Sequence, residues 1–472
     1  MRFIVITLLF LTTISLSQTN YGDINFMIDS GDFTKAQNMI DKLVSEKNLN
    51  EREVLELKFQ REKLDRIKLD FRKTEDEVLS YIQKYIPEAN KTDLLKWEKD
   101  GYLEYKIIDS VKYYFNRAHT NFFRINKEAK KIKIAAEGNR KDNLDLFLEK
   151  YVPNIIEAAK FEGSGLVKPV NIKLNYRLIV NPDIVPTGEI IRCWLPYPRE
   201  GHARQSNVEL LKVNSHEYVI ADNKHLQRTL YIEKIAKEGE PTIFNYELKY
   251  TASNEYFNLD SNNIIEYNVN SDVYKNYISE VEPHIVYSEK IKKLSKTIIQ
   301  NETIPYLKAK KIYKWINDNI PWAGAREYST LLNISDYCLS KGYGDCGIQT
   351  LTFITLCRYN GIPAKWQSGW MLHPGSVNLH DWCELYFEGI GWIPVDQSFG
   401  LLDCDKEEVK WFFLGGIDAY HLIINDGYSE PLYPAKIYPR SETVDFQRGE
   451  VEWRGGNLYF NDWDYFMEVE YF

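Results

Sequence analysis

The hydrophobic period of this chain changes twice, and each change marks a different kind of secondary structure. From Tyr21 to about Ala159, apolar residues recur at the spacing of amphipathic helices. Near Lys168 apolar and polar residues begin to alternate, which is the pattern of a half-buried strand. The helical period returns from Ser288. The order of helices, then strands, then helices predicts an α+β protein with several domains.

The chain has 472 residues, which is too long for one hydrophobic core, so several domains are expected. We predict, in order, a signal peptide at 1–17, a helical domain at 18–165, a β-sandwich domain at 166–270, a mixed helix and strand domain at 271–440, and a C-terminal β tail at 441–472. We assign no chemistry to the helical domain and expect it to serve packing or the binding of a protein partner.

The start of the sequence indicates export. Arg2 supplies a short basic beginning, residues 3–14 form an almost unbroken apolar run, and Ser15 and Ser17 are small side chains where a signal peptidase reads. The run is too short to span a bilayer, and no later stretch approaches the roughly 20 apolar residues that spanning requires. We therefore predict a periplasmic or secreted protein, cleaved after Ser17, with no transmembrane span.

Charge and cysteine spacing exclude several functional classes. A formal net charge of −9 argues against nucleic acid or an anionic membrane as the main partner. The six cysteines, at positions 193, 338, 346, 357, 383 and 404, form no CxxC pair and no Cys/His cluster with ligand spacing. We therefore expect no structural zinc site, and the sequence implies no metal or organic cofactor. Cys193, in the alternating region, is expected to be a buried core thiol.

Cys346 lies at the start of a predicted helix. Asp345 precedes it as a candidate N-cap, and the apolar stripe that follows ends at Asn360 and Gly361, which form a helix stop signal. Free backbone N–H groups and the positive end of the helix dipole favour a thiolate in the first turn. The Asp345 carboxylate would oppose that charge unless it caps backwards, toward the N–H of Ile348 or its neighbour. The position therefore predicts a nucleophilic thiol.

A thiol nucleophile needs a proton acceptor and a group that orients the acceptor. Downstream of Cys346, aromatic and β-prone residues flank a Gly-containing turn, which predicts a hairpin. If Tyr386 opposes Trp392, then His380 lies diagonal to Asp396 on the same face of the hairpin. A slip of one residue would place the two on opposite faces. We predict that Cys346, His380 and Asp396 form a catalytic triad.

The segments GDCGIQTLTFITLCRYNGIPAKWQSGW and HDWCELYFEGIGWIPVD resemble the core of the transglutaminase-like superfamily, over about 315–396. In that superfamily, a Cys at the start of a central helix is paired with His and Asp on adjacent antiparallel strands. The resemblance implies that 271–440 is a catalytic domain with a papain-like core, in which the Cys-bearing helix packs on an antiparallel sheet. It also implies that Cys346 is the nucleophile, His380 the general base and acid, and Asp396 the orienting group.

The resemblance leaves the second oxyanion donor and the reaction open. The Cys346 N–H is one expected donor, and an upstream side chain, Trp322 or Tyr343, is the candidate for the other. Attack on an amide carbonyl would give an acyl-enzyme, which water or a second amine would resolve. The export signal favours hydrolysis of a peptide or protein substrate by a cysteine peptidase or amidase. The alternatives are a true transglutaminase with an amine acceptor, and a binding or scaffold module with an idle triad.

Overall fold

A computed structural model describes residues 21–46, 49–139 and 141–472, so the predicted signal peptide at 1–17 lies outside the described residues. The chain divides into two compact units, Met1–Gly138 and Asn139–Phe472. Within the described ranges, no helix is both long enough and apolar enough to cross a membrane.

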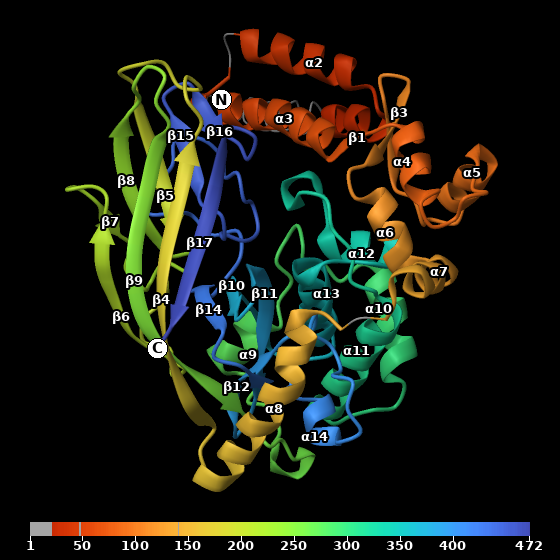
Figure 1. The fold of residues 1–472 in the computed structure, drawn as a ribbon, viewed down its shortest axis with the longest axis vertical. Helices are drawn as coiled ribbons and strands as arrows, with labels where there is room; N and C mark the ends of the chain where they lie inside the picture. Colours follow the sequence, from red (N-terminus) through yellow and green to blue (C-terminus); the bar gives the residue numbers. More distant parts are fainter. Residues whose placement is uncertain (1–20, 47–48, 140) are drawn as a thin grey trace, which may run out of the picture. The chain divides into compact units, whose positions relative to one another are not determined.

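The first unit combines helices with a small antiparallel sheet of order β1-β3-β2 (Figure 1). Its elements are α2 (Phe33–Ser45), α3 (Glu51–Asp70), β1 (Phe71–Lys73), α4 (Glu75–Ile82), α5 (Lys91–Lys99), β2 (Tyr105–Ile108), β3 (Val111–Phe115), α6 (Ala118–Ile125) and α7 (Lys127–Glu137). The sheet is an addition to the helical domain predicted from the sequence. Asp109 and Ser110 form the turn of the β2–β3 hairpin with positive φ angles. Because this turn contains no Gly, the sequence pattern did not predict the hairpin.

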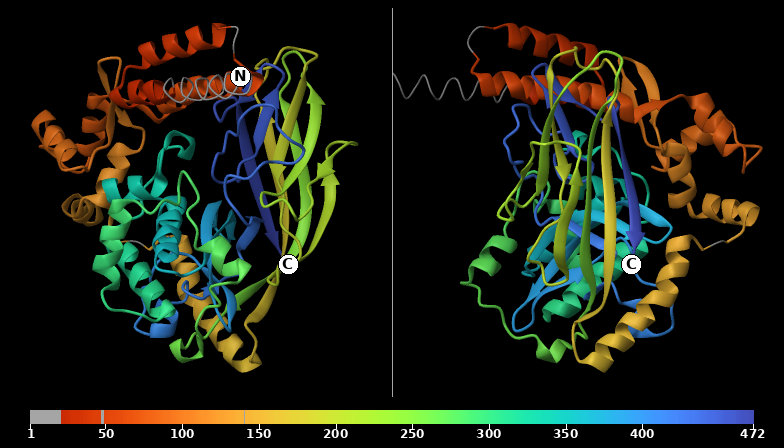
Figure 2. Two further views of the ribbon diagram at one scale, coloured as in Figure 1. Left: turned by 180° about the vertical axis from the view of Figure 1, so that it is seen from behind. Right: turned by 60° about the vertical axis from the view of Figure 1, so that its left-hand side comes forward.

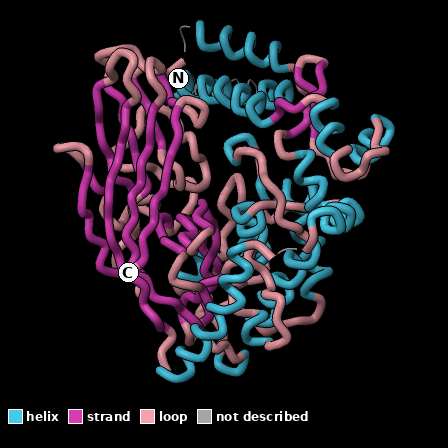
Figure 3. The backbone as a smooth tube through the Cα atoms, viewed as in Figure 1, coloured by secondary structure: helices cyan, strands magenta, loops and turns pink. Residues whose placement is uncertain are grey.

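Two antiparallel sheets form a β-sandwich in the second unit (Figure 3). One has the order β13-β9-β4-β17, with β6 beside β9, and the other has the order β16-β15-β5-β8-β7. The strands are β4 (Leu166–Val180), β5 (Ile190–Pro196), β6 (Gln205–Val213), β7 (Val219–Ile220), β8 (Thr229–Ile235), β9 (Thr242–Tyr256), β13 (Gly416–Ile417), β15 (Glu450–Trp453), β16 (Gly456–Leu458) and β17 (Trp463–Tyr471). Alternate residues of β4 and β9 are buried between the sheets, and Cys193 is fully buried there, as predicted.

The rest of the second unit is a helical layer against a third antiparallel sheet, of order β12-β11-β10-β14 (Figure 1). Its elements are α8 (Asn143–Glu162), α9 (Asp272–Tyr277), α10 (Glu289–Ile299), α11 (Pro305–Asn319), α12 (Ile334–Lys341), α13 (Cys346–Tyr359), β10 (Ala364–His373), β11 (Ser376–Phe387), β12 (Gly391–Val395), α14 (Glu407–Lys410) and β14 (His421–Asn425), with 3₁₀ turns at Ser261–Asn263 and Tyr328–Thr330. Buried residues of α13 and β11 share one hydrophobic cluster, so the helix packs on the sheet.

Two segments join partners far away in the sequence. Leu148, Val152 and Ile155 of α8 lie in the same hydrophobic cluster as α13, so this helix belongs to the second unit, although the sequence grouped it with the helices before it. Strand β17, in the predicted C-terminal tail, pairs with β4 along its whole length (Figure 2). The last strand therefore extends the sheet beyond β4 and completes this layer of the sandwich.

Candidate active site

Helix α13 begins at Cys346 because Asp345 caps it. The Asp345 side chain accepts a hydrogen bond from the Ile348 N–H at 3.1 Å, which confirms the predicted backward cap. The helix ends at Tyr359, and Gly361 follows with a φ of +74°, as its stop signal predicts. These local signals place the thiol in the first turn of a buried helix.

Strands β11 and β12 pair in the predicted register. Tyr386 lies opposite Trp392, so His380 and Asp396 project from the same face of the hairpin. The Nε2 atom of His380 and Oδ2 of Asp396 are 2.6 Å apart, and both side chains are buried. Two of the three predicted residues are thus joined directly, and Nδ1 is the ring nitrogen of His380 that remains for another partner.

Asp396 is held as an anion by donors on both of its oxygens. Its Oδ1 accepts hydrogen bonds from Ser398 N, Ser398 Oγ and Phe399 N at 2.9–3.1 Å. Burial by itself would raise the pKa of Asp396, but the imidazoles of His380 and His421 outweigh it and hold that pKa well below its usual range. The carboxylate is therefore fixed in charge and in orientation.

The thiol of Cys346 contacts Asp381, the residue after the predicted base. Its Sγ donates to Oδ2 of Asp381 at 3.4 Å, while Gln447 Nε2 donates to the other oxygen of Asp381 at 2.7 Å and to the carbonyl of His380 at 2.6 Å. Because successive residues of a strand point to opposite faces, His380 and Asp381 leave β11 on different sides. The structure therefore joins His380 to Asp396, and Cys346 to Asp381.

This arrangement corrects the prediction that the first turn of the helix favours a thiolate. Burial, followed by the charges of Asp381 and Asp345, raises the pKa of the Cys346 thiol well above its usual range. Burial and the nearby Asp445 and Asp345 likewise raise the pKa of Asp381. Burial and the two adjacent acids therefore oppose the effect of the helix dipole and favour the neutral form of the thiol.

Sequence reasoning missed Tyr328, which lies beside the nucleophile. Its hydroxyl donates to Asp345 Oδ1 at 2.7 Å. A Cβ atom on Gly347 would collide with this hydroxyl and would lie 2.7 Å from Asp381 Oδ2. The glycine after Cys346 therefore allows Tyr328 and Asp381 to approach the helix start.

The two oxyanion candidates lie on the segments that lead to Cys346. The backbone of Trp322 forms a parallel bridge with Gly344, and its side chain is 37% exposed. The Tyr343 side chain is buried, with its hydroxyl 3.4 Å from the hydroxyl of Tyr337. The role of either residue as an oxyanion donor stays a prediction.

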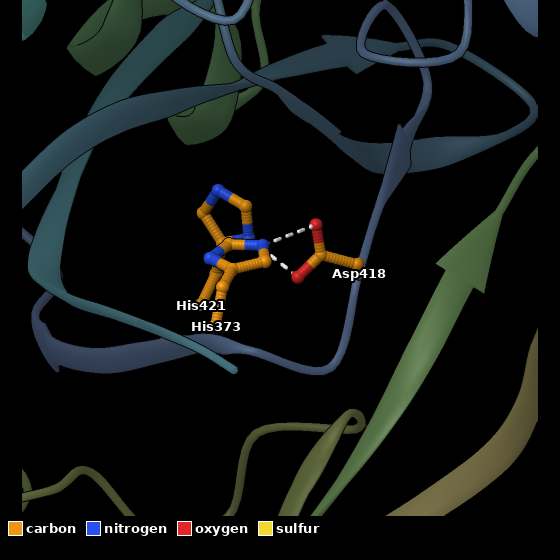
Figure 4. Close-up of side chains that lie close together, drawn as sticks. All are labelled: His373, Asp418 and His421. Carbon is orange, nitrogen blue, oxygen red and sulfur yellow. Dashed lines mark hydrogen bonds and ion pairs between the residues drawn. The ribbon is translucent and has the colours of Figure 1, made fainter. Parts of the chain in front are cut away.

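A second buried cluster adjoins Asp396, and no sequence spacing indicated it. His373 on β10, Asp418 in the turn before β14 and His421 at the start of β14 converge (Figure 4). All three side chains are fully buried, and imidazole and carboxylate groups of this kind are also metal ligands. His421 additionally contacts Asp396, so the cluster is continuous with the predicted triad.

Comparison with known proteins agrees with the family resemblance of the two segments that contain Cys346 and the His380–Asp396 pair. Residues 292–397 match the sequence model of the transglutaminase-like superfamily, so the predicted transglutaminase-like core is confirmed. The chain is similar to a proposed cysteine protease from Cytophaga hutchinsonii, with 16% identity, a TM-score of 0.44, and coverage of 65% of this chain and 91% of that one. It is also similar to the periplasmic domain of TgpA from Pseudomonas aeruginosa, with 12% identity, a TM-score of 0.28, and coverage of 48% and 88%. No curated protein matches the sequence.

Proposed function

We propose that this transglutaminase-like chain is an exported thiol enzyme that hydrolyses amide bonds in peptides or proteins. Cys346 is the nucleophile, His380 the general base and acid, and Asp396 the orienting group. The observation that carries the proposal is the buried 2.6 Å pair of His380 and Asp396, formed on the strands that pack against the helix headed by Cys346. Burying an ionised carboxylate costs desolvation free energy. A role in orienting the catalytic imidazole explains why Asp396 is buried in spite of that cost.

The proposed reaction has two steps. The Cys346 thiol passes its proton to His380, and Sγ attacks the amide carbonyl; the C–N bond then breaks, and the amine leaves with the proton from His380. In the second step His380 removes a proton from water, the hydroxide attacks the thioester, the C–S bond breaks, and the thiol regains its proton. The first step requires Cys346 to leave Asp381 and reach His380, although the side chains of these two residues leave β11 on opposite sides.

Water is sufficient to resolve the acyl-enzyme, whereas transamidation also needs a bound amine. We therefore propose hydrolysis, as in a cysteine peptidase or amidase, with cross-linking as the competing outcome. A peptide library incubated with and without a primary amine, and analysed by mass spectrometry, separates the two. Cleaved peptides in both samples support hydrolysis, while amine adducts in place of cleavage products would assign a transglutaminase.

Cys357 offers a matched control for the nucleophile, because it is a fully buried cysteine of the same helix. Cys346→Ala should abolish turnover and leave folding intact, whereas Cys357→Ala should retain it. Residual turnover in Cys346→Ala above about a thousandth of wild type would assign a different nucleophile. Sequencing the N-terminus of the mature protein tests export, with Gln18 expected as the first residue.

A further inference from the structure

His421 lies between two buried carboxylates. Its Nε2 is 3.1 Å from Oδ2 of Asp396, and its Nδ1 is 3.0 Å from Oδ1 of Asp418. The side chains of all three residues are completely buried. Both nitrogens of one imidazole therefore face carboxylate oxygens, away from water.

The contacts continue from Asp418 to a third histidine. The other oxygen of Asp418, Oδ2, is 2.9 Å from Nε2 of His373, as the dashed lines toward Asp418 in Figure 4 illustrate. With the His380 contact to Asp396, the five side chains form one chain, in the order His373, Asp418, His421, Asp396, His380. The histidine of the proposed triad is thus one end of a buried network.

Counting protons along this network determines the state of His421. Asp396 accepts from Ser398 and Phe399, and Asp418 accepts from the Tyr420 N–H at 2.9 Å. Burial opposes ionisation, but the neighbouring imidazoles outweigh it and hold the pKa of both carboxyls below its usual range, so both act as acceptors. A neutral imidazole carries one N–H, and its bare nitrogen would face a carboxylate lone pair. Two acceptors on opposite sides therefore require an N–H on each nitrogen of His421.

Hydrogen bonding accounts for the distances better than a shared metal ion does. The N···O separations between Asp418 and its two histidines are 2.9 and 3.0 Å, which are ordinary hydrogen-bond lengths. Neighbouring ligands of a tetrahedral zinc ion, with bonds near 2.0 Å, lie about 3.3 Å apart. The distances therefore indicate that hydrogen bonds, and not a shared metal ion, hold the cluster together.

We propose that His421 is a positioning residue of the proposed active site: a permanent imidazolium that holds Oδ2 of Asp396, the oxygen that His380 also contacts, with Asp418 as its counter-ion. The inference rests on the proposed function, because it gives Asp396 the role of orienting the catalytic histidine. His373 completes the hydrogen bonding of Asp418 and does not touch Asp396.

The charges explain what such a clamp contributes. Two carboxylates and one imidazolium leave the buried network with a single negative charge, and a proton on His380 brings it to neutrality. Burial opposes a charge on His421, but Asp418 and Asp396 outweigh it and raise the pKa of His421 to about 9. His421 therefore stays charged, and the network as a whole becomes neutral when His380 takes the proton that Cys346 gives up.

The groups around His421 come from several elements. His373 lies on β10 and His380 on β11, with ring centroids 5.4 and 5.3 Å from the His421 ring. Arg204, before β6 of the sandwich, donates Nη1 to the His421 carbonyl at 2.7 Å, and burial lowers the pKa of its guanidinium. The anions that face His421 are Asp396 and Asp418.

The protonation of His421 is tested without any enzymatic turnover. In the inactive Cys346→Ala protein, ¹H–¹⁵N correlation spectra of the histidine rings, assigned with His421→Gln, should show both nitrogens of His421 protonated from about pH 6 to about pH 8. A neutral tautomer over that range would overturn the proposal. So would a stoichiometric metal ion, detected by elemental analysis of the wild-type protein and absent from His421→Gln.

Kinetics with a matched control test the positioning role. His421→Gln should lower kcat about tenfold or more with little change in KM, because Asp396 loses one of its two clamps. The acid limb of its pH–rate profile should move to higher pH by at least about half a unit, since a positive charge beside His380 has gone. His373→Gln, which disturbs only the far end of the network, should leave that limb in place. Equal profiles for both variants would refute the role, whereas absence of turnover in the wild type would count only against the proposed function.

Discussion

Replacing Asp381 with Asn should accelerate alkylation of Cys346. The wild-type carboxylate lies 3.4 Å from Sγ, and its charge opposes the thiolate. In the variant, the amide oxygen still accepts from Gln447, and the amide NH₂ faces Sγ in place of Oδ2. The substitution therefore exchanges a repulsive acceptor for a neutral donor, with almost no change in volume.

The separation sets the size of the effect. Two unit charges 3.4 Å apart repel by about 1 kcal/mol in water and by about 5 kcal/mol at an effective dielectric constant of about 20. A tenfold change in an equilibrium constant corresponds to about 1.4 kcal/mol. Even the lower figure raises the thiolate fraction roughly fivefold at a given pH. We take this fivefold increase as the minimum, because bulk water gives the strongest screening of the two charges and the Cys346 side chain is only partly exposed to it.

The assay is the rate of iodoacetamide labelling of Cys346, followed by peptide mass spectrometry between about pH 5 and about pH 9. The gain should vanish at low pH, where the raised pKa of Asp381 leaves its carboxyl neutral in the wild type as well. Asp445→Asn is the matched control, because Asp445 is also an acid near the site with a raised pKa, of about 6, and should change the labelling less. Equal labelling of wild type and Asp381→Asn at every pH would refute the electrostatic argument. Slower labelling together with loss of turnover would make Asp381 the base.

Three further outcomes are expected. His380→Ala should reduce turnover nearly as much as loss of the nucleophile, whereas Asp396→Asn should cost about two to four decades, since an amide cannot stabilise the imidazolium; full activity in Asp396→Asn would remove it from the triad. Burial, followed by the charge of Asp445, raises the pKa of Glu442 to about 8. The folded state then holds this proton more tightly than the unfolded state, so its contribution to stability is complete below the ordinary carboxyl pKa and is lost as the pH rises to about 8. The Tm should fall over that range, and less steeply in Glu442→Gln; parallel slopes would contradict this. Gly347→Ala should reduce both turnover and Tm, because its Cβ would lie 2.7 Å from Asp381 Oδ2, and an unchanged Tm would show that the helix start can move aside.

Much of the site depends on signals that lie close together in the sequence. The cap by Asp345, the helix start at Cys346 and the stop at Gly361 involve residues within one helix and its ends. The register that brings His380 to Asp396 follows from a short turn and the two-residue period of the flanking strands. Patterns of this range can be interpreted without the fold, because each contact is determined by a few neighbouring residues.

Tertiary structure alone decided which acid meets the thiol and what lies behind Asp396. The face of β11 on which α13 packs makes Asp381 the partner of Cys346, and no sequence period specifies that face. His421 reaches Asp396 across 25 positions, and His373 reaches Asp418 across 45, through the pairing of β10 with β14. Such contacts arise when strands distant in sequence meet in one sheet and their buried polar groups must find partners. The sequence therefore determined the local elements and the His380–Asp396 pair, while long-range packing determined the electrostatic surroundings.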